Sequence, residues 1–172
     1  MLELIIPNHG NFILDFDEAC PERFSFCKLL YENESLKLNV GEDYLYVYIE
    51  CILYQIRNHF VITSEKVFGE MGKWQEYYYY DDEYNIGHAK EIDDMKKSIL
   101  FSESHFACFL YQYKESIWLE FNQGYEEQNM IDAYEFYSNP QNYRILFTEI
   151  TDEVLKEWES RLQAINELIR IR

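Results

Sequence analysis

Glycine, proline and positive charge are scarce in this chain of 172 residues, which contains 6 glycines, 3 prolines and 15 lysines and arginines together. The glycines never cluster as G-x-G-x-x-G or stand before Lys-Ser/Thr, so the sequence lacks the common phosphate-binding loops. No apolar run approaches the roughly 20 residues that a membrane-spanning helix needs. The segment Met1–Pro7 has neither the basic region nor the long apolar region of a signal peptide. We therefore expect a cytoplasmic protein without a membrane partner.

Cysteine is also scarce and widely spaced, and Cys20, Cys27, Cys51 and Cys108 form no Cys-x-x-Cys pair. This spacing lacks the common zinc motifs and the redox dithiol motif. Unpaired thiols agree with a reduced compartment, because disulfides persist mainly in oxidising ones.

Apolar and aromatic residues are plentiful, at 48% and 18% of the chain. This content exceeds that of disordered chains and is sufficient for a compact core. The length, the absence of an internal repeat and the absence of a Pro/Gly-rich linker predict a single globular domain over residues 1–172.

Negative charge is the second excess, since 32 aspartates and glutamates give a net charge of −17. Such a charge repels nucleic-acid phosphates and anionic membranes, so neither is expected as a partner. It attracts a basic protein. An incidental solvated surface is the alternative explanation.

Short segments rich in β-prone and alternating apolar residues predict a mostly antiparallel sheet. The predicted strands are Leu2–Ile6, Asn11–Phe16, Phe24–Leu30, Ser35–Val40, Phe60–Phe68, Phe106–Tyr113, Ile117–Phe121 and Tyr143–Ile150. The sixth and seventh form the clearest hairpin, because three residues separate them.

Apolar residues at spacings of three and four predict two amphipathic helices. The first covers Asp43–Asn58 with Asp43 as its N-cap, and the second follows the N-cap Thr151 near the C-terminus. Gly87–Leu100 is predicted as a short helix or an irregular segment. The elements together predict an α+β fold, in which two or three helices, including a C-terminal amphipathic helix, pack on a mostly antiparallel sheet.

Catalytic, metal and cofactor motifs are weak throughout. The acids that begin at Asp81 do not follow the EF-hand spacing, because Ile86 occupies the sixth position, which requires glycine. Cys108 lies close to His105, but the strand that holds Cys108 is predicted as core. Nothing in the sequence selects one carboxylate pair for acid–base chemistry. We therefore expect no catalytic residue, no metal and no cofactor.

The most distinctive stretch is Tyr77–Glu83, where four consecutive tyrosines run into three acids. If this stretch is a strand, alternate tyrosines face opposite sides, so half enter the core and half are exposed. Exposed rings and carboxylates suit the recognition of a basic protein. An ordinary aromatic strand with a charged turn is the alternative. The predicted partner-binding residues are Tyr78, Tyr80, Asp81, Asp82, Glu83, Tyr125, Glu126 and Glu127.

A family likeness rests on the size of the chain, on its acidic aromatic character and on two passages, Leu36–Asp43 and Phe147–Trp158. The chain resembles the small acidic immunity proteins that neutralise toxins of bacterial polymorphic and contact-dependent growth inhibition systems. The resemblance implies a non-catalytic cytoplasmic antidote that binds one cognate toxin domain and blocks its active site. Many such toxins are nucleases with basic clefts. We expect a monomer or a weak homodimer.

Two other functions stay open. A small hydrolase with a carboxylate-based site predicts a deep pocket that holds two carboxylates with separated pKa values. An acidic mimic of nucleic acid predicts carboxylates at regular spacing along an elongated surface.

Overall fold

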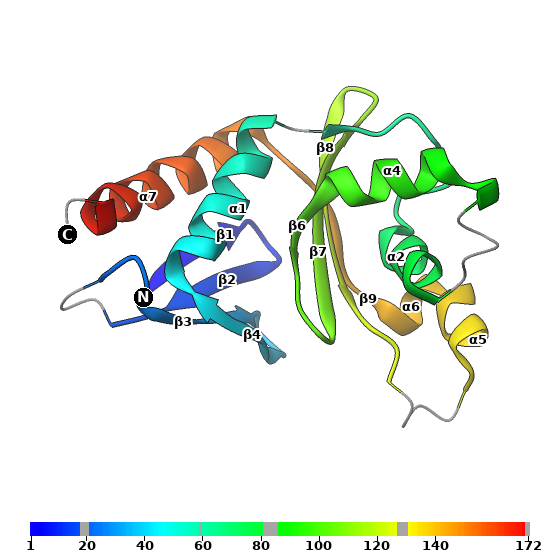
Figure 1. Ribbon diagram of the computed structural model, residues 1–172, viewed down its shortest axis with the longest axis horizontal. Helices are drawn as coiled ribbons and strands as arrows, with labels where there is room; N and C mark the ends of the chain where they lie inside the picture. The colour runs from blue at the N-terminus through cyan, green and yellow to red at the C-terminus, as the bar shows by residue number, and fades with distance from the viewer. Residues whose placement is uncertain (18–20, 59, 81–85, 127–130, 171–172) are drawn as a thin grey trace. The chain divides into compact units, whose positions relative to one another are not determined.

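Apolar residues near the N-terminus form four strands that follow one another in an antiparallel sheet (Figure 1). The computed structural model describes residues 1–17, 21–58, 60–80, 86–126 and 131–170. The strands are β1 (Leu2–Ile6), β2 (Gly10–Asp15), β3 (Phe26–Glu32) and β4 (Lys37–Tyr44). Each strand pairs with the next. The four predicted strands are confirmed, although β3 begins at Phe26 instead of Phe24 and β4 ends at Tyr44 instead of Val40.

The turn between β1 and β2 depends on glycine. Gly10 has a φ of +107°, a conformation that side chains rarely adopt. A Cβ at this position would lie 2.2 Å from the backbone oxygen of Glu32, so the backbone of β3 passes directly over it.

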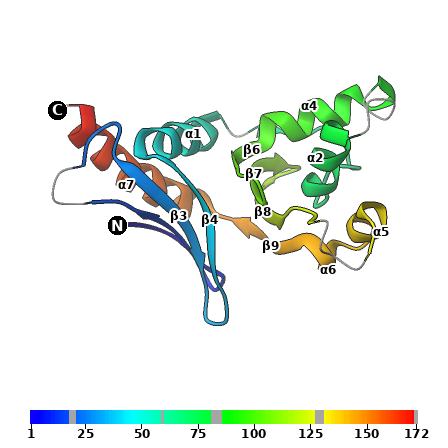
Figure 2. The same cartoon turned by 60° about the horizontal axis from the view of Figure 1, so that its bottom comes forward.

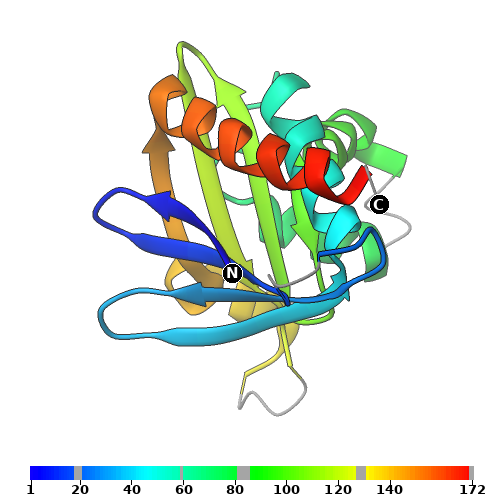
Figure 3. The same cartoon turned by 90° about the vertical axis from the view of Figure 1, so that its left-hand side faces the viewer.

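Two helices accompany this sheet, α1 (Leu45–Asn58) and α7 (Asp152–Arg170). Both helices are confirmed, but Asp43 is not the N-cap of α1, because it pairs with Cys27 inside β4. Thr151 does cap α7, since its Oγ1 accepts a hydrogen bond from the backbone N–H of Val154 at 3.5 Å. Figure 3 shows α7 alongside β1. The buried ring of Trp158 fixes this contact by donating from Nε1 to the backbone oxygen of Ile5 at 2.9 Å.

A second, mixed sheet follows. Its strands are β5 (Phe60–Val61), β6 (Ile99–Ser102), β7 (Phe106–Tyr113), β8 (Ser116–Gln123) and β9 (Arg144–Ile150). Their order is β5-β7-β8-β9, with β6 also paired to β7. The β7–β8 hairpin and β9 confirm the sequence predictions, and the parallel pairing of β5 with β7 makes the sheet mixed.

The strand predicted over Phe60–Phe68 ends at Val61 and is wrong beyond that residue. The backbone N–H of Ile62 still donates to the backbone oxygen of Gln112 in β7 at 3.0 Å. The N–H groups of Thr63 and Ser64 then leave the sheet, because they donate to the buried carboxylate of Asp94 at 2.8 and 2.9 Å. A turn then leads into the helix that follows.

Helices accompany the second sheet: α2 (Met71–Tyr80), α4 (Ala89–Ser98), α5 (Ala133–Ser138) and α6 (Pro140–Tyr143). Figure 2 shows α2 and α4 side by side next to β7 and β8. Their shared core contains the buried side chains of Met71, Trp74, Met95 and Phe109. Helix α4 confirms the helical alternative for Gly87–Leu100.

The chain divides into two compact units, which we call the N-terminal unit (residues 1–57 and 150–172) and the central unit (residues 58–149). The α+β fold class is confirmed, and the single domain over residues 1–172 stays a prediction. Among the described helices, none has the length and apolar character that crossing a membrane requires.

Candidate functional site

The four tyrosines of the distinctive stretch lie at the end of helix α2, so the strand predicted for them is wrong. The physical reason is the pattern of the preceding residues. Met71, Trp74 and Tyr78 recur at spacings of three and four and pack against one core, which selects a helix. A strand reading of the tyrosines alone overlooks this longer window.

Helical geometry spreads the tyrosines around α2 instead of alternating them. Tyr78 turns toward α4, where the Lys96 ammonium lies 3.9 Å from the centre of its ring. The ring centres of Tyr77 and Tyr134 lie 6.1 Å apart. Tyr79 is 61% exposed and lines a pocket.

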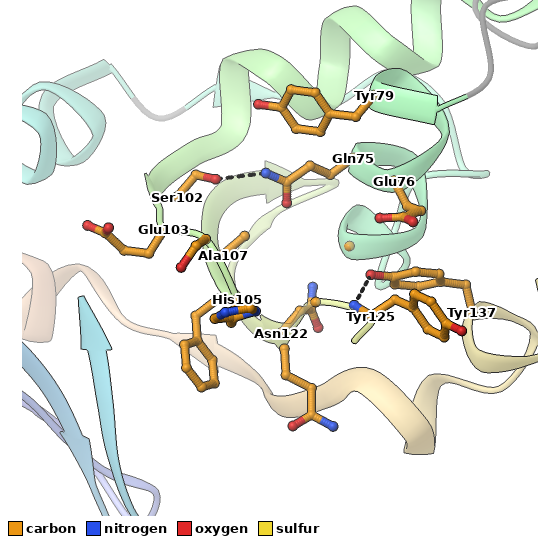
Figure 4. A pocket seen from close by; sticks show the side chains of 15 residues that line it. Gln75, Glu76, Tyr79, Ser102, Glu103, His105, Ala107, Asn122, Tyr125 and Tyr137 are labelled. Carbon is orange, nitrogen blue, oxygen red and sulfur yellow. Dashed lines mark hydrogen bonds between the residues drawn. The ribbon is translucent and has the colours of Figure 1, made fainter. Parts of the chain in front are cut away.

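This pocket has a volume of about 430 Å³ and lies within the central unit (Figure 4). Its wall comes from α2, the β6–β7 turn, the end of β8 and α5. The main polar and aromatic lining residues are Gln75, Glu76, Tyr79, Glu103, His105, Asn122, Tyr125 and Tyr137.

Hydrogen bonds hold the elements of the wall together. The side-chain amide of Gln75 donates to Ser102 Oγ at 2.8 Å, which joins α2 to the end of β6. The backbone N–H of Gly124 donates to the backbone oxygen of His105 at 2.6 Å, which closes the open end of the β7–β8 hairpin. The elements that line the pocket are therefore joined by hydrogen bonds between side chains and between backbone groups.

A chain of hydrogen bonds orients the carboxylate of Glu76. The backbone N–H of Tyr125 donates to the hydroxyl of Tyr137 at 2.9 Å, and that hydroxyl donates to Glu76. The Tyr125 hydroxyl donates to the backbone oxygen of Ile131 at 3.1 Å. Burial raises the pKa of the Glu76 carboxyl, and the bond from Tyr137 opposes this rise.

Asn122 supplies a buried acceptor. Its side chain is 1% exposed and its Nδ2 donates to Glu120 Oε1 at 2.7 Å. Its Oδ1 has no hydrogen-bond partner in the described part of the chain. Figure 4 shows Asn122 between Ala107 and Tyr125. A buried amide oxygen without a donor is costly, which makes a bound donor favourable here.

Charge in the pocket wall is mainly negative. Glu76 and Glu103 line it, and the described lining residues include no lysine or arginine. His105 Nδ1 lies 3.8 Å from Glu126 Oε1 at the rim, so an acid accompanies this histidine. The arrangement favours a cation or a donor-rich group over an anion.

The predicted site residues divide into three groups. Tyr125 lines the pocket and Glu126 lies beside it. Tyr78 lies elsewhere, between α2 and α4. The side chain of Tyr80, together with Asp81, Asp82, Glu83 and Glu127, lies outside the described residues.

The structure nevertheless brings the two acidic aromatic segments together, because Tyr79 and Tyr125 line the same pocket. Sequence reasoning missed Glu76, Asn122 and Tyr137. A helix prediction for this stretch would have placed Gln75 and Tyr79 together, since they stand four residues apart on one face of α2.

Other sites are less suited to chemistry. Among the described residues, no group of three or more histidines, cysteines or acids is placed to hold a metal ion. Cys108 is fully buried, and burial raises the pKa of its thiol, which disfavours a nucleophile. The N-terminal unit has a hollow of about 470 Å³, but Arg23 and Arg170 line it beside Glu22 and Glu50, so its charge is mixed.

Comparisons with protein-family models, with curated proteins and with solved structures give no match.

Proposed function

We propose that the protein is a non-catalytic immunity protein that binds and neutralises a basic toxin domain in the cytoplasm. One observation carries this proposal: a single pocket joins tyrosines from both acidic aromatic segments with carboxylates, and its described lining residues include no lysine or arginine. The partner-binding face consists of this pocket and its rim at Glu126.

The two kinds of side chain in this face have different roles in binding. Carboxylates steer a basic partner toward the face and raise the association rate at low salt. Tyrosines supply contact area with little loss of conformational freedom and become anchors once water is excluded. For a nuclease toxin, the carboxylates would take the place of the substrate phosphates.

Complex formation tests the proposal. The toxin to use is the basic domain encoded by the neighbouring reading frame, expressed with and without the present chain. We expect a stable complex and restored growth of cells that make the toxin. Unrelieved growth inhibition without a complex would contradict the proposal.

A matched pair of charge reversals tests the face. Glu126→Lys changes an exposed acid at the rim, and Glu115→Lys changes an exposed acid in the β7–β8 turn at the far end of the hairpin. We expect Glu126→Lys to slow association about threefold at low salt and to flatten its salt dependence, with a smaller effect from Glu115→Lys. Equal effects would remove this face from the mechanism.

A small hydrolase is the second candidate, because the pocket holds Glu76, whose pKa is raised by burial, together with Glu103 and His105. Turnover of generic esters or glycosides that Glu76→Gln abolishes would establish it. Absence of turnover with all of these substrates would argue against it.

A further inference from the structure

The pocket combines acceptors of two kinds with aromatic walls. The carboxylate of Glu76 is half-buried and oriented by Tyr137, and Asn122 offers a buried oxygen without a donor. Tyr79 and Tyr125 add rings to the wall, as Figure 4 shows. A ligand that satisfies this wall must bring several donors, positive charge and a flat surface.

We propose that the pocket receives an arginine side chain of the toxin, whose guanidinium group donates to Asn122 and Glu76 and stacks on a tyrosine. This inference depends on the proposed function, because it identifies the anchor residue of the same partner. It makes the pocket the centre of the interface and the surrounding carboxylates its rim.

Guanidinium fits the wall better than the other cations found in proteins. It is planar, carries five N–H donors and is weakly hydrated, so it binds a carboxylate and an amide oxygen together and lies flat on a ring. Lysine ammonium is compact and strongly hydrated, and it presents no flat face. A divalent metal prefers several hard oxygen ligands, and the described residues place no such group together.

Phosphate and other anions are disfavoured by the same wall. Glu76 and Glu103 repel them, and the described lining residues offer no lysine or arginine to compensate. His105 is accompanied by Glu126.

Titration of the whole chain with N-acetyl-arginine amide, followed by NMR of the backbone amides, tests the inference without the toxin. We expect saturable shifts at Gly124 and Tyr125, which lie in the pocket wall. The lysine analogue should bind more weakly, and the neutral citrulline analogue, which has the same shape, should cause no saturable shift.

Variants locate the binding group. Glu76→Gln removes the oriented carboxylate and should weaken arginine amide binding about fivefold. Tyr79→Ala truncates an exposed ring and should weaken it about threefold. Glu115→Gln removes an acid outside the pocket wall and should bind as the parent does.

Each of three outcomes would overturn the inference. The first is that the citrulline analogue shifts the amides as much as the arginine amide does, and the second is that neither pocket amide shows a saturable shift. The third is that Glu76→Gln binds the arginine amide as tightly as the parent chain does. Complex formation with the toxin tests the proposed function separately. A toxin complex that forms equally well with the parent chain and with Glu76→Gln would reject the arginine anchor alone.

Discussion

The buried carboxylate of Glu120 makes the stability of the central unit depend on pH. Glu120 lies on β8 and is 0% exposed. Its Oε1 accepts from the backbone N–H of Met71 at 2.9 Å and from Asn122 Nδ2 at 2.7 Å, and its Oε2 accepts from the Tyr111 hydroxyl at 3.0 Å. Burial raises its pKa from 4.5 to about 6, even though these bonds and Arg144 favour the charged form.

The direction of the effect follows from proton linkage. The folded state holds the proton of Glu120 more tightly than the unfolded state, because the folded pKa is the higher one. The stability contribution is therefore fully present below pH 4.5 and is lost as the pH rises through about 6. The pKa difference corresponds to a total loss of about 2 kcal/mol, of which about half occurs between roughly pH 5.2 and pH 7.5.

Glu120→Gln isolates this contribution. Glutamine keeps an oxygen for Met71 and Asn122 but carries no charge, so it removes the titration and adds a cost that is constant with pH. We expect the unfolding free energy of the parent minus that of the variant to fall by about 1 kcal/mol between roughly pH 5.2 and pH 7.5. Urea unfolding followed by tryptophan fluorescence measures both curves.

The control is Glu115→Gln, which also removes one negative charge but from an exposed turn. It accounts for the general effect of net charge on stability. The reasoning would be refuted if the unfolding free energy of the parent minus that of Glu120→Gln stayed constant across the pH range or rose with pH.

Three further predictions concern packing, each measured by urea unfolding. Gly10→Ala should destabilise the chain by more than about 3 kcal/mol, because its Cβ would meet a β3 carbonyl at 2.2 Å; a loss below about 1 kcal/mol would contradict this. Gly72→Ala should destabilise by about 1–2 kcal/mol despite better helix propensity, since its Cβ would lie 2.9 Å from Asn122 Nδ2; a more stable variant would show that Asn122 moves aside freely. Trp158→Phe should cost about 2–3 kcal/mol through the lost bond to β1 and a cavity, with Trp118→Phe, which is only partly buried, costing less.

Local patterns in the sequence predicted much of the fold. The strands of the first sheet, the β7–β8 hairpin and α7 each have a period that matches their own structure, so short windows suffice. Helix α7 also has a capping residue, Thr151, and its apolar stripe carries Trp158 to β1. These elements agree with the sequence because local preference and tertiary packing favour the same structure.

The failures arise where a distant residue decides the local structure. The segment after Val61 has β-prone residues, but the carboxylate of Asp94 binds the N–H groups of Thr63 and Ser64, so pairing with β7 does not continue beyond Ile62. Asp43 has the chemistry of a cap, but pairing with Cys27 extends β4 as far as Tyr44. A short stretch of sequence around Thr63 or Asp43 does not include Asp94 or Cys27, so it cannot predict where these strands end.

The candidate site combines both situations. Charge and aromatic content drew attention to two segments, and the pocket joins them through Tyr79 and Tyr125. The strand geometry assumed for the tyrosines is wrong and did not single out Tyr79, because a strand places alternate residues on one face, whereas a helix places residues three and four apart there. Glu76 and Tyr137 had no distinctive pattern, since they matter only once α2, β8 and α5 have met. The acidic aromatic segments can thus be recognised from composition, but the pocket that Tyr79 and Tyr125 line together requires the folded chain.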